Sequence, residues 1–273
     1  MAVVAAAAAA SSCIDRGAMS AGGADLYLEL LKRSLTDTLF EEEPHPDKLT
    51  DSQYILSFAS HYIRGRAVTM LPLERLDNLR FCIETALSDG VPGDIIETGV
   101  WRGGAMIFAR GILKAHAVTD RTVWVADSFE GLPNPDAERF PNEAKAHAGV
   151  VMSKVFGHFA ASLEDVQRNF SAYGLLDDRV RFLKGWFKDT LPGAPIERLA
   201  VMRLDGDYYE STRDALVHLY PRLTPGGFVI IDDFGEDTWT YCRKAVDEYR
   251  TEHRIDDPII KVDSRCWYWR RAR

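Results

Sequence analysis

Four aspartates in this 273-residue chain follow two apolar runs of the kind that form buried parallel strands. They are Asp205 and Asp207 after the first run, and Asp232 and Asp233 after the second. Ligands of open α/β sheets bind at the carboxyl ends of the strands, so these acids should face the functional edge of the sheet. Converging carboxylates repel one another unless a proton or a cation lies between them.

A hard divalent cation would remove this repulsion. Mg²⁺ and Ca²⁺ take oxygen ligands, and Mg²⁺ usually keeps coordination positions open for water or substrate. An acid directly after a strand can instead cap the helix that follows, and this alternative stays open for any single aspartate of the set. Taken together, the four acids favour one shared metal site.

A second candidate site is the glycine-rich run Glu97-Thr98-Gly99-Val100-Trp101-Arg102-Gly103-Gly104. It follows a predicted strand and opens a predicted helix over 105–114, so its glycines would let the backbone approach a ligand at a helix N-terminus. The dinucleotide fingerprint Gly-x-Gly-x-x-Gly, aligned on Gly99, requires glycine where this chain has Trp101. Because that second glycine admits the pyrophosphate, the run disfavours NAD.

Residues near this loop indicate the chemistry of the ligand. Glu97 at the end of the first strand favours a cationic group, and Asp127 at the end of the second suits a ribose diol, with a cap or loop acid as the alternative. Gly185 and Trp186 follow the third strand and suit an adenine slot, although Trp186 can equally be a core residue. A ligand with ribose, no phosphates and a positive group is S-adenosylmethionine.

Short apolar runs that alternate with helical patterns predict a parallel sheet. The predicted parallel strands are 94–98, 122–126, 180–183, 199–204 and 228–231. The later runs 259–262 and 267–269 are too close for a helical crossover and predict a hairpin with an antiparallel strand. The long stretch 131–161 exceeds an ordinary connection and predicts a lid or substrate loop.

Three amphipathic helices should precede this sheet. The first starts near Asp25 and ends before the acidic, proline-containing run 41–46, the second surrounds Tyr54, and the third extends from Pro72 to Leu87. The apolar stripe of the first helix is predicted to consist of Leu26, Leu30, Leu31, Leu35 and Leu39.

Composition bounds the class of protein. A hydrophobic content of 46% over 273 residues can bury the core of one α/β domain. The net charge of −8 argues against nucleic acid or an anionic membrane as the main partner, and no run approaches the roughly 18 apolar residues of a membrane span. The widely spaced Cys13, Cys82, Cys242 and Cys266 predict reduced thiols in a cytoplasmic protein. The alanine-rich residues 1–22 lack the basic region and leucine core of an export signal and predict a flexible tail.

Five motifs in this order resemble the macrocin O-methyltransferase (TylF/MycF) family, whose members methylate sugar hydroxyls on bacterial natural products. The motifs are 97–104, 123–129, 185–190, 204–207 and 231–233, and the resemblance extends from about Leu26 to Trp269. It implies a class I methyltransferase fold, that is, a Rossmann-like, mostly parallel seven-stranded sheet with one antiparallel strand and helices on both faces. It also implies S-adenosylmethionine, Mg²⁺ and usually a homodimer.

The resemblance assigns roles to individual residues. Asp205, Asp232 and Asp233 match the metal ligands and Asp207 matches the proposed base, although the sequence leaves open whether Asp205 or Asp207 takes the proton. We divide the chain into the tail 1–22, an N-terminal helical extension or lid over 23–90, and a methyltransferase domain over 91–273. The residues expected to bind the cofactor are Thr69, Met70, Glu97, Thr98, Gly99, Gly103, Gly104, Asp127, Ser128, Gly185, Trp186 and Asp205.

Three other functions stay open at this point. A catechol-type O-methyltransferase for phenolic diols makes the same demand for two adjacent oxygens on Mg²⁺. A nicotinamide-dependent oxidoreductase is disfavoured by Trp101 and the acidic residues, and a non-catalytic partner protein by the intact set of acids. Nucleophilic hydrolysis is disfavoured because Ser128 and Ser211 lack a Gly-x-Ser-x-Gly elbow, and no two histidines have metal-ligand helical spacing.

Overall fold

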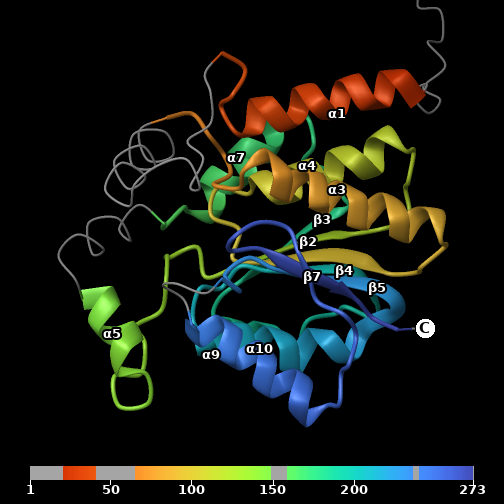
Figure 1. Cartoon of the computed structure of the whole chain (residues 1–273). Helices are drawn as coiled ribbons and strands as arrows, with labels where there is room; N and C mark the ends of the chain where they lie inside the picture. The colour runs from red at the N-terminus through yellow and green to blue at the C-terminus, as the bar shows by residue number, and fades with distance from the viewer. Residues whose placement is uncertain (1–20, 41–64, 149–158, 236–239, 273) are drawn as a thin grey trace, which may run out of the picture.

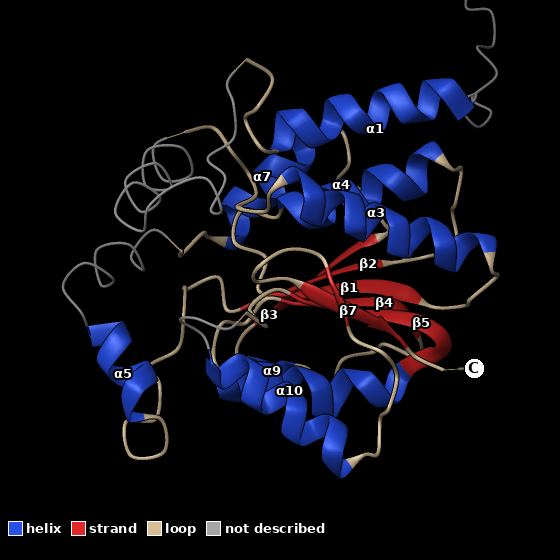
Figure 2. Ribbon diagram, in the orientation of Figure 1, coloured by secondary structure: helices blue, strands red, loops and turns tan. Residues whose placement is uncertain are grey.

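A seven-stranded sheet lies at the centre of the chain, between two layers of helices (Figure 1; Figure 2). The computed structural model describes residues 21–40, 65–148, 159–235 and 240–272. The strand order is β3-β2-β1-β4-β5-β7-β6. The first five strands pair in parallel and β7 is antiparallel to both of its neighbours, as predicted. The strands are β1 (Asp94–Thr98), β2 (Val123–Asp127), β3 (Val180–Lys184), β4 (Leu199–Leu204), β5 (Leu223–Ile231), β6 (Ile260–Lys261) and β7 (Trp267–Arg270).

The helices cover both faces of this sheet (Figure 2). One layer contains α1 (Ala21–Leu35), α3 (Leu73–Ser88), α4 (Gly104–Ala115) and α7 (Leu163–Ala172). The opposite layer contains α9 (Tyr209–Leu219) and α10 (Thr240–Glu252), with the short α8 (Phe187–Thr190) packed against α9 and the turn η3 (Tyr220–Arg222) after it. The remaining helix, α5 (Pro141–Ala148), stands beside these layers, on the side where α9 begins.

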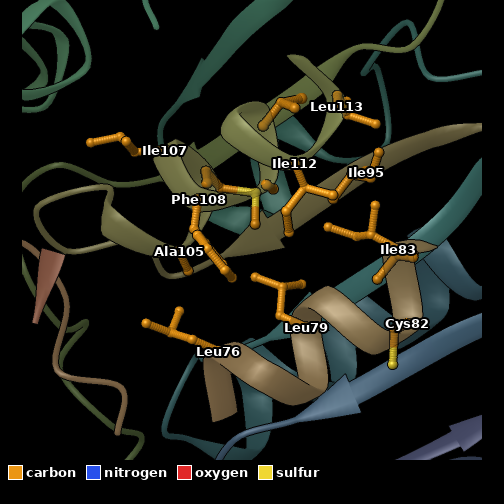
Figure 3. Close-up of a cluster of buried hydrophobic side chains, with 14 of the residues drawn as sticks. Leu76, Leu79, Cys82, Ile83, Ile95, Ala105, Ile107, Phe108, Ile112 and Leu113 are labelled. Carbon is orange, nitrogen blue, oxygen red and sulfur yellow. The ribbon is translucent and has the colours of Figure 1, made fainter. Parts of the chain in front are cut away.

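Successive side chains of a strand point to opposite faces of the sheet, so the core has two parts. Ile95 packs under α3 and α4, whereas its neighbour Ile96 packs toward α9 and α10. Figure 3 shows the first part, where Leu79 of α3 and Ile112 of α4 meet above the sheet. A parallel sheet needs both faces covered, which is why its strands read as unbroken apolar runs in the sequence.

The N-terminal helices differ from the expectation in two respects. Helix α1 begins at Ala21, so Gly22 and Gly23 lie in its first turn instead of ending the preceding segment. Its buried face contains Leu28, whereas Leu26 and Leu30 are 76% and 58% exposed, so the predicted leucine stripe was partly wrong. Helix α3 spans the predicted range, and α1 and α3 both pack against α4.

Several predicted features lie outside the described residues. They are the tail over 1–20, the helix around Tyr54, and the part of the long connection over 149–158. Cys82, Cys242 and Cys266 are buried free thiols. Among the described residues, no helix is long and apolar enough to cross a membrane.

Candidate active site

The turns that follow the central strands are joined by main-chain hydrogen bonds at the carboxyl edge of the sheet. Gly99 N donates to Ala126 O, Asp205 N to Thr98 O, and Asp232 N to Leu204 O, each at 2.9 Å. The strand order reverses between β1 and β4, and such a switch point opens the crevice where α/β sheets bind ligands. The glycine-rich loop therefore lies directly beside the acidic residues.

The glycines of this loop are required by contacts within the protein. Gly99 has φ 89°, and a Cβ atom there would overlap the carbonyl oxygen of Asp205. A Cβ atom on Gly103, at φ 88°, would lie 2.8 Å from Val166 Cγ1, and Gly104 N donates to Val68 O at 2.9 Å. The glycines therefore make room for neighbouring backbone and side chains, and their expected approach to a ligand stays a prediction.

Thr69 and Met70 lie across the start of α4, next to this loop. A Cβ atom on Gly104 would lie 2.7 Å from Thr69 Cβ, and Met70 packs against Trp101. Trp101 itself has φ 48°, a left-handed conformation that is uncommon for a bulky residue and that is often found at functional sites. The structure thus brings Thr69 and Met70 together with the glycine-rich loop.

Asp127, at the end of β2, binds main-chain amides of the glycine-rich loop and of the turn that follows β2. Its Oδ2 accepts a hydrogen bond from Val100 N and its Oδ1 one from Phe129 N, both at 2.7 Å. Burial raises the pKa of Asp127, and these main-chain donors oppose that shift. The Ser128 hydroxyl donates to Gly131 O at 2.8 Å, so it also holds the turn. The described contacts of both residues are therefore within the protein.

Gly185 and Trp186 follow β3 at the same edge. Gly185 N donates to Asp127 O at 2.9 Å, and a Cβ atom on Gly185 would lie 2.8 Å from Thr190 Cγ2. Trp186 is partly exposed at the start of α8, so it is not a fully buried core residue.

Three of the four aspartates form one group. Carboxylate oxygens of Asp205, Asp207 and Asp233 lie within 4.8 Å of one another. Burial and then the charge of Asp232 raise the pKa of Asp205 to about 6. Burial and neighbouring carboxylates raise the pKa values of Asp207 and Asp233 well above the ordinary range. The three carboxylates therefore repel one another, and the group would bind a cation or protons.

The donor set fits a divalent cation. Asp233 Oδ2 is buried and has no hydrogen-bond partner among the described residues. A buried carboxylate oxygen without a partner is costly, and a cation would satisfy it together with the two nearby acids. All of the donors are oxygens, which suits Mg²⁺ or Ca²⁺ better than a softer metal.

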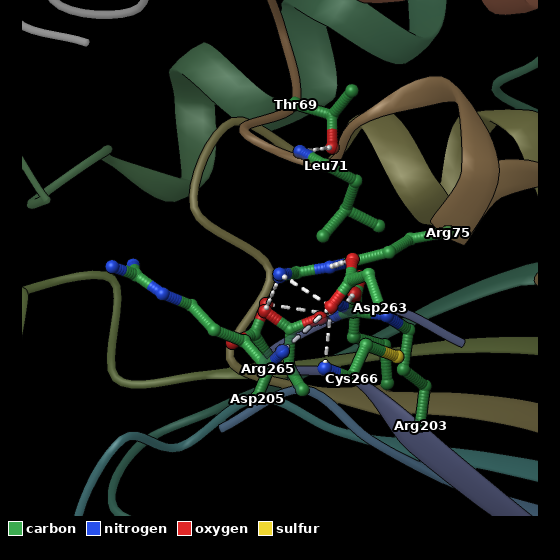
Figure 4. Close-up of polar contacts among 10 residues, drawn as sticks. Thr69, Leu71, Arg75, Arg203, Asp205, Asp263, Arg265 and Cys266 are labelled. Carbon is green, nitrogen blue, oxygen red and sulfur yellow. Dashed lines mark hydrogen bonds and ion pairs between the residues drawn. The ribbon is translucent and has the colours of Figure 1, made fainter. Parts of the chain in front are cut away.

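Asp232 differs from the expected metal set because both of its oxygens are engaged by arginines. Its Oδ2 accepts from Arg75 Nη1 at 2.8 Å, and its Oδ1 pairs with Arg203 Nη2. Arg75 also donates to both oxygens of Asp263, through Nε at 2.6 Å and Nη2 at 3.2 Å (Figure 4). Asp207, expected as a base, occupies a place in the cluster instead of Asp232.

Arg203 is the central cation beneath the acidic cluster. Its side chain is 1% exposed, and Nη1 donates to Glu97 Oε1 at 2.5 Å and to Asp205 Oδ2 at 2.7 Å. Burial raises the pKa of Glu97 to about 8, although Arg203 acts to lower it. Glu97 thus contacts Arg203 through Oε1, and its expected contact with a cationic ligand stays a prediction.

Sequence reasoning missed several residues of this edge. Arg203 interrupts the apolar run 199–204, and a charged residue within a buried strand is a signal that was available. Arg75 lies on an amphipathic helix far away in sequence, and nothing in its spacing marked it. Glu143 and His147 in the long connection contact Tyr209 and Tyr208, immediately after Asp207.

Comparison with known proteins adds to this geometry. The family model for macrocin-O-methyltransferase (TylF) matches residues 63–271. Mycinamicin III 3''-O-methyltransferase of Micromonospora griseorubida is 52% identical over 253 residues, which cover 92% of this chain and 98% of that protein. The 8-demethyl-8-(2,3-dimethoxy-alpha-L-rhamnosyl)-tetracenomycin-C 4'-O-methyltransferase of Streptomyces olivaceus is 51% identical over 259 residues, covering 92% of this chain and 95% of that protein.

Solved structures agree with the family match. The O-methyltransferase NovP is 45% identical, with a TM-score of 0.78, and the match covers 92% of this chain and all of that one. The calicheamicin methyltransferase CalS11, at 20% identity and a TM-score of 0.56 over 93% of this chain and 94% of its own, shares the fold. These matches set aside the oxidoreductase and the non-catalytic protein. The chain belongs to the macrocin O-methyltransferase (TylF) family and is an S-adenosylmethionine-dependent O-methyltransferase.

Proposed function

We propose that this enzyme uses Mg²⁺ and methylates a hydroxyl group on a sugar of a bacterial natural-product glycoside. The observation that carries the proposal is the cluster of Asp205, Asp207 and Asp233 beside the glycine-rich loop. The names of the relatives support the choice of acceptor, since one of them contains a rhamnosyl group. A third relative, from Streptomyces niveus, is a demethyldecarbamoylnovobiocin O-methyltransferase, 47% identical over 255 residues.

The cation would be held by Asp205 and Asp233, which belong both to the expected ligand set and to the observed cluster. When bound there, it would lower the pKa of a coordinated hydroxyl oxygen. Asp232 would join the ligand set by exchanging one of its two arginine contacts for the cation. The remaining carboxylate, Asp207, would then serve as ligand or base.

Asp207 is our candidate for the proton acceptor. An alcohol must lose its proton as it attacks the methyl group, and the Asp207 carboxylate lies within the cluster where that hydroxyl would be held. The loop 99–104 and Asp127 would hold the cofactor so that its methyl group faces this carboxylate cluster. We also propose that the other residues expected from the sequence to bind the cofactor do so, among them Thr69, Met70 and Trp186.

A catechol-type acceptor remains the second candidate, since a phenolic diol also presents two adjacent oxygens to the cluster. We also propose a homodimer and a cytoplasmic location. Exposed Leu26 and Leu30 on α1 offer apolar surface that supports self-association. Light scattering coupled to gel filtration would measure the mass in solution.

The test of the function is methyl transfer from S-adenosylmethionine with a labelled methyl group. A panel of deoxysugar glycosides and phenolic diols should show turnover with the glycosides, and turnover confined to the diols would contradict the proposal. Asp233→Asn should weaken Mg²⁺ binding in calorimetry, whereas Asp207→Asn should keep Mg²⁺ and cofactor binding and lose turnover. Asp232→Asn decides the third ligand, because unchanged Mg²⁺ affinity would leave Asp232 with its arginines.

A further inference from the structure

Helix α9 begins two residues after Asp207, with Tyr208 as its N-cap residue. Its N-cap residue, Tyr208, makes no capping hydrogen bond with its side chain. The first main-chain amides of a helix lack partners within the helix, so they need acceptors from elsewhere. Glu143 of α5, 66 positions earlier, accepts a hydrogen bond from Tyr209 N at 3.0 Å.

Further contacts from the same segment end on the same turn. His147 Nδ1 lies 2.7 Å from the Tyr208 hydroxyl, within hydrogen-bond distance. Phe140 stacks on Tyr209 with ring centroids 4.7 Å apart and planes at 29°. Arg139 Nη1 lies 2.8 Å from Glu210 Oε1. The segment 139–147 thus contacts three consecutive residues, 208–210, each through its own side chain.

These contacts join α5 and the residues just before it to the start of α9. Of the residues of α5 whose side chains are described, Glu143 alone is buried, at 3% exposure, while Pro141, Asn142 and Lys145 are exposed. A helix with so little buried apolar surface depends on specific polar contacts for its position.

The short connection between β4 and α9 transmits this position to Asp207. It contains Asp205, Gly206, Asp207 and Tyr208, with Tyr208 N donating to Gly206 O at 2.6 Å. Asp207 has φ 59°, a left-handed conformation that a non-glycine residue keeps only when its surroundings fix it. Strand β4 fixes one end of the connection, and α5 contacts the other end.

We propose that Glu143 and His147 are positioning residues, which hold the Tyr208-Tyr209 turn and thereby aim the Asp207 carboxylate at the acceptor hydroxyl. The proposal rests on the proposed function in one respect, the role of Asp207 as proton acceptor. It gives the described part of this connection, 131–148, a role besides that of the predicted lid, because Glu143 of α5 caps the start of α9. Neither residue needs to touch the substrate for this effect.

The test compares Glu143→Ala, Glu143→Gln and Glu138→Ala in the full chain. The glutamine side chain would keep an oxygen acceptor for Tyr209 N, so Glu143→Gln should keep the parent's hydrogen exchange in 208–212 and its kcat. Glu138 is exposed in the same segment, so Glu138→Ala is the matched control for loss of one negative charge. His147→Ala, at a partly exposed position, is the second variant if Glu143→Ala does not fold.

Two measurements are needed. Hydrogen exchange followed by mass spectrometry should show faster exchange in peptides covering 208–212 for Glu143→Ala alone. With labelled S-adenosylmethionine and the best acceptor of the panel, kcat should fall by about tenfold to a hundredfold, because small displacements of a reacting group cost that much. The dissociation constant of S-adenosylmethionine should change by less than about twofold, since the cofactor loop is not touched.

The outcomes separate the two proposals. Unchanged exchange in 208–212, or faster exchange with unchanged kcat while Asp207→Asn abolishes turnover, would overturn the positioning role alone. Full turnover by Asp207→Asn would instead remove Asp207 as the base. An equal loss of kcat in Glu138→Ala would show that only the charge of the segment matters, and would also overturn the positioning role.

Discussion

Replacement of Arg203 by methionine should destabilise the folded protein strongly. The guanidinium is 1% exposed and pairs with Glu97, Asp205 and Asp232, whose side chains are 2%, 26% and 8% exposed. Methionine fills much of the same hydrocarbon volume, so Arg203→Met removes the charge while leaving only a small cavity. The three carboxylates then lose a shared cation at a site that water reaches poorly.

The expected size of this loss follows from the burial of the partners. Removing one partner of a buried ion pair costs about 3–5 kcal/mol, because an uncompensated charge stays behind. Asp232 keeps Arg75 as a second partner, which places the expected loss in the free energy of unfolding near the lower end, at about 3 kcal/mol. An exposed pair such as Arg33 with Glu29 is worth only about 0.3–0.5 kcal/mol, so Arg33→Met is the matched control.

Urea unfolding followed by far-UV circular dichroism measures these differences. A double-mutant cycle with Glu97→Gln isolates one of the pairs at a pH above about 8, where Glu97 of the parent protein is charged. In Arg203→Met the pKa of Glu97 rises further, because Arg203 acts to lower it. The double variant should be more stable than Arg203→Met, because it no longer buries a carboxyl group without its cation. An Arg203→Met protein within about 1 kcal/mol of the parent would refute this reasoning about the buried network.

Three further predictions concern other parts of the site. Gly99→Ala should lower the free energy of unfolding by at least about 2 kcal/mol, because it combines a left-handed φ with overlap on Asp205 O. Gly174→Ala is the control, since Gly174 has φ 64° and nothing within 4 Å of an added Cβ atom, and it should cost about 1 kcal/mol. Urea unfolding measures both values. Burial raises the pKa of Glu143 from 4.5 to about 7, so the folded protein binds this proton more tightly than the unfolded chain and loses stability as pH rises across that window. The urea midpoint of Glu143→Gln should therefore rise relative to that of the parent protein between pH 4.5 and about 7, and the difference should stay constant above that range. A difference between the two midpoints that does not change with pH would contradict the raised pKa. Chelation of divalent cations should abolish methyl transfer, reversibly on adding Mg²⁺, without changing the near-UV circular dichroism spectrum, because Arg75 and Arg203 keep their ion pairs; unfolding on chelation would contradict this.

The strands of the sheet could be predicted from the sequence, because a strand that is buried on both faces consists mostly of consecutive apolar residues. Strands β1 and β4 were predicted with the bounds that the structure has, and the hairpin of β6 and β7 followed from the short spacing between its runs. Helix α1 was harder, because leucines lie on more than one of its faces. The stripe of Leu28, Leu31 and Leu35 is buried, whereas Leu26 and Leu30 fit a helical period equally well and are exposed.

The acidic residues of the site were predictable because each follows a strand, and strand ends share one edge. Their partners were not predictable, since an ion pair between Arg75 and Asp232 joins positions 157 residues apart. The division of the four aspartates into three that converge and one held by arginines depends on those partners. The docking of Glu143 on α9 had no local signal either, because an acid in a long connection is ordinarily a solvated one.

The ion pairs of Arg75 also have a consequence for how the protein matures. Arg75 and Asp263 are separated by 188 positions. Chains emerge from the ribosome N-terminus first, so Arg75 has its full set of partners only after Asp263 has been made. A chain truncated before Asp263 would carry the cofactor loop and all four aspartates and still lack the contact that anchors Arg75. The fixed position of Arg75 beside Asp232 should therefore be reached only after the cofactor loop and all four aspartates have been made.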